Sequence, residues 1–137
     1  MHQKKLYIAD DNIEFAEFCG TVAEREGWVV SISSNGADLL KALAAETGPA
    51  FILCDIQMPD CDGIEVIQAL PAASPRFRVR FVTGGSMTNA LTARLIAQAR
   101  DIDIGRFLTK PVTMEELQNT LRNEERLLCA TANLDIR

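Results

Sequence analysis

The residues best suited to chemistry are three carboxylates that come directly after apolar runs of the sequence. Asp10 and Asp11 follow the run that ends at Ala9, and Asp55 follows the continuously apolar run Phe51–Cys54. Carboxylates that lie close together repel one another unless a cation joins them. A hard divalent ion takes oxygen ligands, and Mg²⁺ accepts one or two carboxylates together with waters and a phosphate. These residues therefore predict a site for Mg²⁺ (or Mn²⁺).

Two further polar side chains follow apolar runs in the second half of the chain. Thr83 follows the run Arg78–Val82, and Lys110 comes shortly after the run Gly105–Leu108. A hydroxyl donates a hydrogen bond, and a lysine ammonium meets a phosphoryl oxygen as a compact charge. Each residue alone has an ordinary explanation, since Asp caps helices or opens turns and Lys is usually a solvated surface residue. Their coincidence at the ends of apolar runs predicts one shared site.

The elements that must position these residues follow a regular alternation of five apolar runs and five helical segments. The runs are Lys5–Ala9, Trp28–Ser33, Ala50–Cys54, Arg78–Val82 and Gly105–Leu108. The first helical segment has an apolar stripe with helical spacing at Phe15, Phe18, Cys19, Val22 and Ala23, and Gly27 ends it. The next three are Ala37–Ala45, Ile64–Leu70, stopped by Pro71, and Thr88–Ala99.

The fifth helical segment starts at Thr113, which the pattern predicts as an N-cap with Glu116 as its capping-box partner. Met114, Leu117 and Leu121 then mark its inner face. Strict alternation of strands and helices implies right-handed crossovers and a parallel sheet that helices cover on both sides. Ligands of such sheets bind beyond the carboxyl ends of the strands, where the candidate residues stand. We therefore expect a doubly wound α/β fold with a five-stranded parallel sheet.

Composition narrows the class of protein. The 137 residues fit one compact domain, and 47% apolar residues are enough for a continuous core. The net charge of −5 argues against direct nucleic-acid binding, which needs a basic surface. The four cysteines lack C-x-x-C spacing and His2 is the only histidine, so we expect reduced thiols in the cytoplasm and no zinc site. No signal peptide and no membrane-spanning run is visible, so we expect no membrane association.

The sequence resembles a response-regulator receiver domain of two-component signalling over roughly residues 4 to 125. The matching stretches are Tyr7–Asn12, Asp55–Gly63, Val82–Gly84 and Phe107–Pro111, of which the D-x-x-M-P-x-x-x-G pattern from Asp55 is the most specific. The resemblance implies a flavodoxin-like fold with strand order 2-1-3-4-5 and five helices. It also implies a receiver domain over residues 1–125, with residues 126–137 as a C-terminal tail or the start of a linker.

The resemblance assigns a role to each candidate residue. Asp55 matches the phosphoacceptor, and Asp10 and Asp11 match the acidic pair that holds the metal together with Asp55. Gln57 matches the position whose backbone carbonyl also binds the metal. These assignments agree with the chemistry of phosphoryl transfer, which depends on positioning and on neutralisation of oxygen charge.

The remaining matches concern the phosphoryl oxygens and the switch. Thr83 matches the hydroxyl that follows the phosphoryl group, while Gly84 leaves space and a backbone N–H near the same oxygen. Lys110 matches the lysine that pairs with a phosphoryl oxygen, and the bond to Pro111 is implied to be cis. Phe107 matches the aromatic switch position.

The implied function is that of a signalling switch rather than an enzyme acting on other substrates. A phosphohistidine of a sensor histidine kinase or histidine phosphotransfer protein would supply the phosphoryl group to Asp55. The response would change the surface formed by the fourth helix, fifth strand and fifth helix, and so control a partner or a fused output domain. The stretch from Thr83 to Lys110 is longer than in compact chemotaxis-type receivers, by about one helical turn. That form resembles receivers fused to cyclic-diguanylate phosphodiesterases.

Three other readings remain in competition. A pseudo-receiver that binds partners without phosphorylation tends to lose one of the five polar residues, all of which are present here. A phosphohydrolase of the haloacid-dehalogenase type places a D-x-D motif on the first strand, whereas the nucleophile candidate here follows the third. A flavin-binding flavodoxin needs a Ser/Thr/Gly-rich phosphate loop after the first strand, and Asp10-Asp11-Asn12 stands there instead. Whether the chain is a stand-alone protein or part of a longer regulator stays open.

Overall fold

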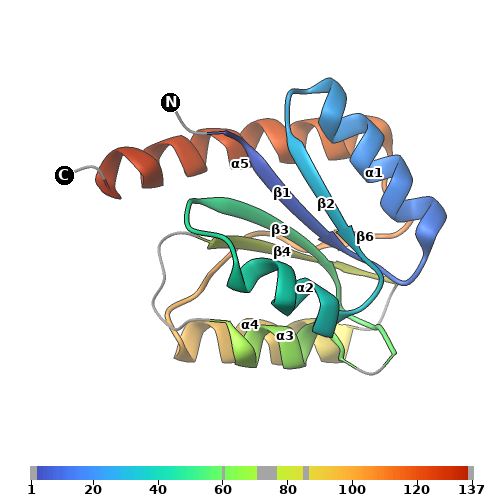
Figure 1. Cartoon of the computed structure of the whole chain (residues 1–137). Helices are drawn as coiled ribbons and strands as arrows, with labels where there is room; N and C mark the ends of the chain where they lie inside the picture. Colours follow the sequence, from blue (N-terminus) through green and yellow to red (C-terminus); the bar gives the residue numbers. More distant parts are fainter. Residues whose placement is uncertain (1–2, 60, 71–76, 85–86, 136–137) are drawn as a thin grey trace.

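The protein is a three-layer α/β structure in a computed structural model that describes residues 3–59, 61–70, 77–84 and 87–135 (Figure 1). The strands are β1 (Lys5–Ala9), β2 (Val29–Ser33), β3 (Ala50–Asp55), β4 (Phe77–Thr83), β5 (Asp103–Ile104) and β6 (Leu108–Thr109). The helices are α1 (Ile13–Arg25), α2 (Gly36–Ala44), α3 (Gly63–Ala69), α4 (Met87–Ala99) and α5 (Met114–Asp135). Pro71, the predicted stop of the third helix, and Asp60 of the D-x-x-M-P-x-x-x-G pattern lie outside the described residues.

The sheet is parallel, with strand order β2-β1-β3-β4-β5, and β6 also pairs with β4. Helices α1 and α5 cover one face of the sheet, and α2, α3 and α4 cover the other (Figure 1). Each face has its own apolar core, and the β3 residues are buried on both sides. The doubly wound α/β fold, its five helices and the order 2-1-3-4-5 are therefore confirmed.

The strand register brings the candidate residues to one edge of the sheet. Ala9 pairs with Cys54, so the following residues Asp10 and Asp55 leave neighbouring strands at the same level. On the other side of β3, Asp55 pairs with Val82. Thr83 pairs with Thr109, which places Lys110 directly beyond the last strand. Side chains far apart in sequence thus share the carboxyl edge of the sheet, as parallel topology requires.

The predicted fifth strand, Gly105–Leu108, is correct only at Leu108. Two short strands flank this segment instead: β5 pairs with Arg78 and Val79, and β6 pairs with Val82 and Thr83. The physical reason lies in side chains that cross this point. A Cβ on Gly105 would stand 2.8 Å from Nε of Arg80 and 3.1 Å from Oε1 of Glu124, so this pair occupies the space beside the chain. Phe107 consequently lies between strands and not within one.

Arg78 and Arg80 of β4 belong to a buried ionic cluster with Glu124 of α5. Glu124 is fully buried, and its two carboxylate oxygens lie 2.5 Å from Nε of Arg78 and 2.7 Å from Nε of Arg80. Arg78 also lies 3.4 Å from the carboxylate of Asp103. Burial of charge is tolerated only when the charges are paired and hydrogen-bonded. The cluster therefore holds the middle of α5 against the sheet.

Helix α5 begins where the sequence predicts. The N–H of Glu116 donates to the hydroxyl of Thr113 at 3.1 Å, which is the predicted N-cap bond. The inner face continues from Leu117 and Leu121 to the buried Leu128, and the helix runs on to Asp135. Residue 125, the proposed end of the receiver domain, thus lies inside a continuous helix. Within the described ranges, no helix has the length and apolar character needed to cross a membrane.

Candidate functional site

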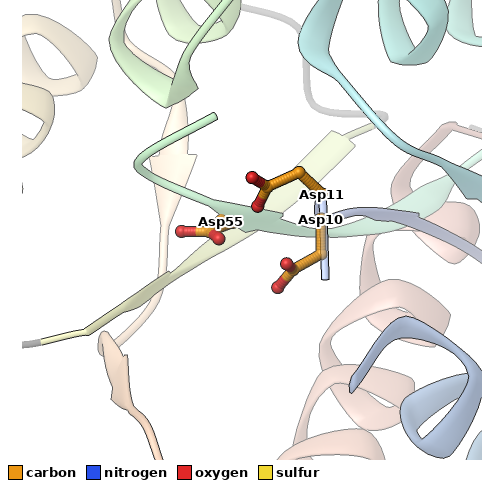
Figure 2. A group of neighbouring side chains, drawn as sticks. All are labelled: Asp10, Asp11 and Asp55. Carbon is orange, nitrogen blue, oxygen red and sulfur yellow. The ribbon is translucent and has the colours of Figure 1, made fainter. Parts of the chain in front are cut away.

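Three carboxylates form the centre of the candidate site. Asp10 and Asp11 follow the end of β1, and Asp55 is the last residue of β3 (Figure 2). Carboxylate oxygens of these three residues all lie within 4.8 Å of one another. Asp10 and Asp55 are buried, with 1% and 7% of their surfaces exposed, whereas Asp11 is exposed. The three carboxylates are therefore accessible to solvent at Asp11, whereas the protein buries them at Asp10 and Asp55.

Backbone N–H groups hold the two buried carboxylates in place. The N–H of Asn12 donates to Oδ1 of Asp10 at 2.8 Å, and the N–H of Gln57 donates to Oδ1 of Asp55 at 3.0 Å. Asn12, and neither aspartate, is the N-cap of α1, because its side chain accepts the N–H of Phe15. The ordinary explanation of Asp10 or Asp11 as a helix cap is thus excluded. Each buried carboxylate keeps its second oxygen toward the site.

Lys110 enters the site from the end of β6. Its Nζ lies 3.0 Å from Oδ2 of Asp10 and 3.3 Å from Oδ2 of Asp55. The backbone N–H of Lys110 donates to the carbonyl of Thr83 at 2.9 Å, which fixes the lysine beside the end of β4. The Lys110–Pro111 peptide bond is cis, as the resemblance implies. The predicted convergence of the lysine with the carboxylates is confirmed.

The electrostatics of the site leave surplus negative charge. Burial raises the pKa of Asp55, the Gln57 N–H opposes this, and the neighbouring Asp10 charge raises the pKa further. Burial alone would lower the pKa of Lys110, but its contacts with Asp10 and Asp55 raise that pKa overall. Among the described residues, one ammonium thus contacts two buried carboxylates, and the third carboxylate, that of Asp11, lies beside them. An additional cation would relieve this imbalance.

The residues fit a divalent metal. Oδ2 of Asp10 is buried and has no well-aligned hydrogen-bond partner, although Nζ of Lys110 lies near it. The Lys110 ammonium is shared between this oxygen and Oδ2 of Asp55, so it compensates the two buried negative charges only in part, and a bound cation would compensate the rest. The donor set consists of carboxylate oxygens, which suits Mg²⁺ or Mn²⁺ and not a soft metal. Asp10, Asp11 and Asp55 are therefore the residues that would hold the ion.

Thr83 and Gly84 stand at the end of β4, next to this centre, whereas Phe107 lies between β5 and β6 and not on the predicted fifth strand. Thr83 is buried at the end of β4, and a Cβ added to Gly84 would meet no heavy atom of the described residues within 4 Å. Phe107 is half-buried between β5 and β6, where its ring meets Phe81 edge-on at a centroid distance of 6.1 Å. The Phe107 side chain therefore packs against the apolar core next to the site, but the core does not bury it completely.

The loop after Asp55 depends on Gly63. The N–H of Ile56 donates to the carbonyl of Val82, and the N–H of Gly63 donates back to the carbonyl of Ile56. A Cβ on Gly63 would stand 2.8 Å from the Cα of Ile56 and 2.9 Å from the ring of Phe81. Only glycine permits this approach, which explains the last position of the D-x-x-M-P-x-x-x-G pattern. The loop thereby carries the Gln57 N–H to the Asp55 carboxylate.

Two aromatic contacts were not visible in the sequence. Nζ of Lys110 lies 4.7 Å from the ring centroid of Phe15, and the guanidinium carbon of Arg94 lies 5.1 Å from that of Phe107. Phe15 belongs to the helical stripe of α1, a pattern that predicts core packing and gives no sign of a cation above the ring. The Phe15 ring limits where the lysine ammonium can move. Phe15 is thus a further positioning residue for Lys110.

Comparison with known proteins agrees with this geometry. The family described as "Response regulator receiver domain" matches residues 6–122. The response regulator receiver protein CpdR of Brucella abortus is 28% identical over 130 residues, which cover 93% of this chain and 98% of CpdR. The probable transcriptional regulatory protein TcrX of Mycobacterium tuberculosis is 27% identical over 117 residues, 85% of this chain but only 47% of TcrX.

A solved structure supports the fold independently of sequence. The solution structure of the beryllofluoride-activated NtrC4 receiver domain dimer superposes with a TM-score of 0.76 at 24% identity, covering 94% of this chain and 99% of the other. At this low sequence identity, the superposition supports only a common fold. The family match, in contrast, spans most of the chain and includes the carboxylates and the lysine of the site. The chain therefore belongs to the response regulator receiver domain family.

Proposed function

We propose that this receiver domain accepts a phosphoryl group on Asp55 and uses a divalent metal to do so. The observation that carries the proposal is the meeting of Asp10, Asp11, Asp55 and Lys110 at one edge of the sheet. A carboxylate is already a nucleophile and needs no general base. Asp55 stands where an incoming phosphoryl group can reach its oxygen from solvent, because Asp11 is exposed beside it.

Each residue of the site has a role in this transfer. Oδ1 of Asp55 is held by the Gln57 N–H, which leaves Oδ2 to attack phosphorus as the bond to the donor nitrogen or oxygen breaks. Lys110, now shared by two carboxylates, would turn to a phosphoryl oxygen once that oxygen arrives. The Thr83 hydroxyl and the Gly84 N–H would serve a second phosphoryl oxygen. The metal, when bound by Asp10, Asp11, Asp55 and the Gln57 carbonyl, neutralises the charge of carboxylate and phosphoryl oxygens together.

The first test measures phosphorylation and its dependence on metal. Incubation with acetyl phosphate and Mg²⁺ should add one phosphoryl group per chain, detected as a gain in intact mass. Excess chelator should reduce labelling at least about tenfold, because the carboxylates and the phosphoryl group would then be uncompensated like charges. Restoring Mg²⁺ should restore the gain, whereas Na⁺ at equal ionic strength should not. Labelling that chelation leaves unchanged would contradict the metal site, and no labelling with Mg²⁺ would contradict the proposed function.

A second test concerns the coupling of Thr83 to Phe107. A phosphoryl group on Asp55 draws the Thr83 hydroxyl toward the site, and the space released lets Phe107 pack more deeply against Phe81. A double-mutant cycle of Thr83→Ala and Phe107→Ala should therefore show a coupling of roughly 0.5–3 kcal/mol in beryllofluoride affinity. If Phe107 instead keeps one position in the core, the effects of the two substitutions on beryllofluoride affinity should be additive.

The control for this cycle replaces a phenylalanine outside the switch. Phe18 of α1 is also half-buried but packs in the core on the opposite face of the sheet. Thr83→Ala and Phe18→Ala should be additive within the usual error for distant sites, about 0.3–0.5 kcal/mol. Equal coupling in both cycles would indicate general destabilisation and would remove the case for a switch.

The partners follow from the same proposal. A histidine kinase or histidine phosphotransfer protein supplies the phosphoryl group, and the output surface is formed by α4, β5 and α5. On α4, Leu91 and Leu95 are 55% and 66% exposed, which is unusual for large apolar side chains and supports a partner on this face. The curated relatives named above are receiver or transcriptional regulatory proteins, so a cyclic-diguanylate phosphodiesterase as output stays an unsupported prediction.

The domain acts as a switch that promotes only its own phosphorylation and dephosphorylation. A cytoplasmic location agrees with four cysteines that are all free. A division at residue 125 stays a proposal, because α5 crosses that point without a break. This chain spans 47% of TcrX but 98% of CpdR. The lengths of these relatives are therefore compatible with an output domain fused to the receiver domain and with an output on a separate protein.

A further inference from the structure

Strand β2 is an open edge of the sheet that lacks the usual protection of such edges. It stands at the end of the strand order, and within the described residues only β1 pairs with it. Its sequence, Val-Val-Ser-Ile-Ser, contains no charged residue and no proline. Natural proteins commonly place lysine, proline or a bulge on an exposed edge strand to prevent pairing with other chains. Val29 and Ile32 are instead exposed.

The backbone of β2 has a defined set of outward hydrogen-bonding groups. In a parallel pair, alternate residues direct both N–H and C=O toward the neighbouring strand. The N–H of Val29 donates to Lys4, and the carbonyl of Ser33 accepts the N–H of Asp10, so residues 29, 31 and 33 face β1. Val30 and Ile32 therefore direct their N–H and C=O groups away from the sheet. These groups can pair with an added strand.

An acidic groove lies beside this edge. It has a volume of ≈ 390 Å³ and is lined by Val30 and Ile32 of β2 and by one face of α1. The α1 residues are Glu17, Gly20, Thr21 and Glu24. Gly20 allows the helix to approach closely, because a Cβ there would stand 3.2 Å from Cδ1 of Ile32. Among the described residues, neither Glu17 nor Glu24 has an ion-pair partner.

We propose that β2 and this groove form a docking site for an extended segment of a partner protein in which basic residues alternate with apolar or small ones. Such a segment adds a strand to the sheet through the outward groups of Val30 and Ile32. Lysine or arginine stems pack on the Val30 and Ile32 side chains, and their charged ends reach Glu17 and Glu24.

A second copy of this chain fits the edge less well. Pairing of two β2 strands about a twofold axis places the same surface on both sides of the interface. The unpaired carboxylates Glu17 and Glu24 of each copy would then come together, on chains that already carry a net charge of −5. Like charges across an interface disfavour association, whereas a basic segment neutralises them.

The test uses amide hydrogen exchange and NMR on the full chain, with a capped octapeptide of alternating lysine and valine as the probe. Bound peptide should slow the exchange of the Val30 and Ile32 N–H groups and shift their signals. The Val29 and Ser31 N–H groups face β1 and should change little, so neighbouring residues serve as internal controls. An octapeptide of alternating glutamate and valine has the same strand tendency and should not bind.

Substitutions then separate the two components of the site. Glu17→Gln with Glu24→Gln should weaken binding roughly threefold to tenfold, as expected for two exposed ion pairs. Val30→Pro removes an outward N–H without removing a bond to β1, and should abolish binding. If this variant does not fold, the native chain can be tested with a peptide N-methylated at alternate residues, which lacks the N–H groups needed to pair with β2. Loss of binding by this peptide would support strand addition.

Three results would overturn the proposal. If the acidic peptide binds as tightly as the basic one, Glu17 and Glu24 do not select a basic segment. If the N-methylated peptide binds as tightly as the unmodified one, the segment does not bind by adding a strand to the sheet. Concentration-dependent dimerisation that Ile32→Lys abolishes, together with no response of β2 to the basic peptide, would identify a second copy as the occupant. None of these measurements depends on phosphorylation, so the proposal stands or falls separately from the role of Asp55.

Discussion

Asp55→Asn should abolish the gain of a phosphoryl group from acetyl phosphate and Mg²⁺ while the fold is retained. The amide oxygen is a poor nucleophile, and an amide cannot form the acyl phosphate that the carboxylate forms. Asparagine keeps the size of the side chain and can still accept the Gln57 N–H, which lies 3.0 Å from Oδ1 of Asp55. The loss of labelling would therefore report chemistry and not a collapse of the loop.

Stability should not fall in this variant. Burial and the nearby charge of Asp10 raise the pKa of Asp55, so the ionised carboxylate is less favourable in the folded protein than in the unfolded chain. Replacing it by a neutral amide removes that cost near neutral pH, at the expense of one contact with Lys110. We expect an unfolding midpoint equal to or above that of the native chain, measured by urea denaturation.

The matched control is Asp62→Asn, the same chemical change seven positions further along the loop. Asp62 is the N-cap of α3, where its side chain accepts the N–H of Glu65, and asparagine is an equally good cap. This variant should be labelled like the native chain. Persistent labelling of Asp55→Asn at native stoichiometry would show that another residue is the acceptor, and fragment masses would then identify it.

Glu124→Gln should destabilise the fold by about 3–5 kcal/mol, the usual cost of breaking a buried ion pair. The carboxylate of Glu124 is fully buried and serves both Arg78 and Arg80. A neutral amide would leave two arginines, one of them in the middle of β4, without adequate compensation. Urea unfolding followed by circular dichroism measures the free energy of unfolding for the native chain and the variant.

The neighbouring residue provides the control. Glu125→Gln is the same substitution on the same helix, but Glu125 pairs with Lys4 near the surface at 2.9 Å, with 39% of its side chain exposed. Exposed pairs contribute about 0–1 kcal/mol, so this variant should lose little stability. Equal losses in the two variants would mean that the buried cluster contributes no more than a surface pair.

A triple replacement tests the origin of the loss. Arg78→Met, Arg80→Met and Glu124→Leu together remove all three charges of the buried cluster and put apolar side chains in their place, and such exchanges are often neutral or stabilising. Recovery of most of the stability lost by Glu124→Gln would show that the uncompensated charge is the cause. A triple variant as unstable as Glu124→Gln alone would assign the loss to packing.

The sequence by itself determined the order of elements and the chemical identity of the site. Apolar runs and helical stripes are local patterns, so the first four helices and the start of the fifth were predicted to within about two residues. The continuation of α5 to Asp135 was not predicted, because residues 126–137 were interpreted as a tail or linker. A strict alternation of strands and helices allows few topologies, and parallel topology places strand ends on one edge. The gathering of Asp10, Asp55, Thr83 and Lys110 followed from that rule, because each residue stands directly at or just beyond the end of a strand.

Only the tertiary structure decided the features that depend on contacts between distant segments. Glu124 stands among several charged residues in the sequence, with no local sign of burial, and its position between Arg78 and Arg80 arises only from the packing of α5 on the sheet. The same contact crowds Gly105 and divides the fifth strand, which a local apolar pattern cannot indicate.

The open edge at β2 has the same origin. The run Val29–Ser33 predicts a strand, but the sequence does not say which strand of the sheet lacks a second neighbour. Edge position, the outward direction of the Val30 and Ile32 backbone groups and the approach of Glu17 and Glu24 all arise from packing of α1 and β1 against this strand. Local propensity sets which residues form an element, whereas long-range packing sets which of its groups remain available to a partner.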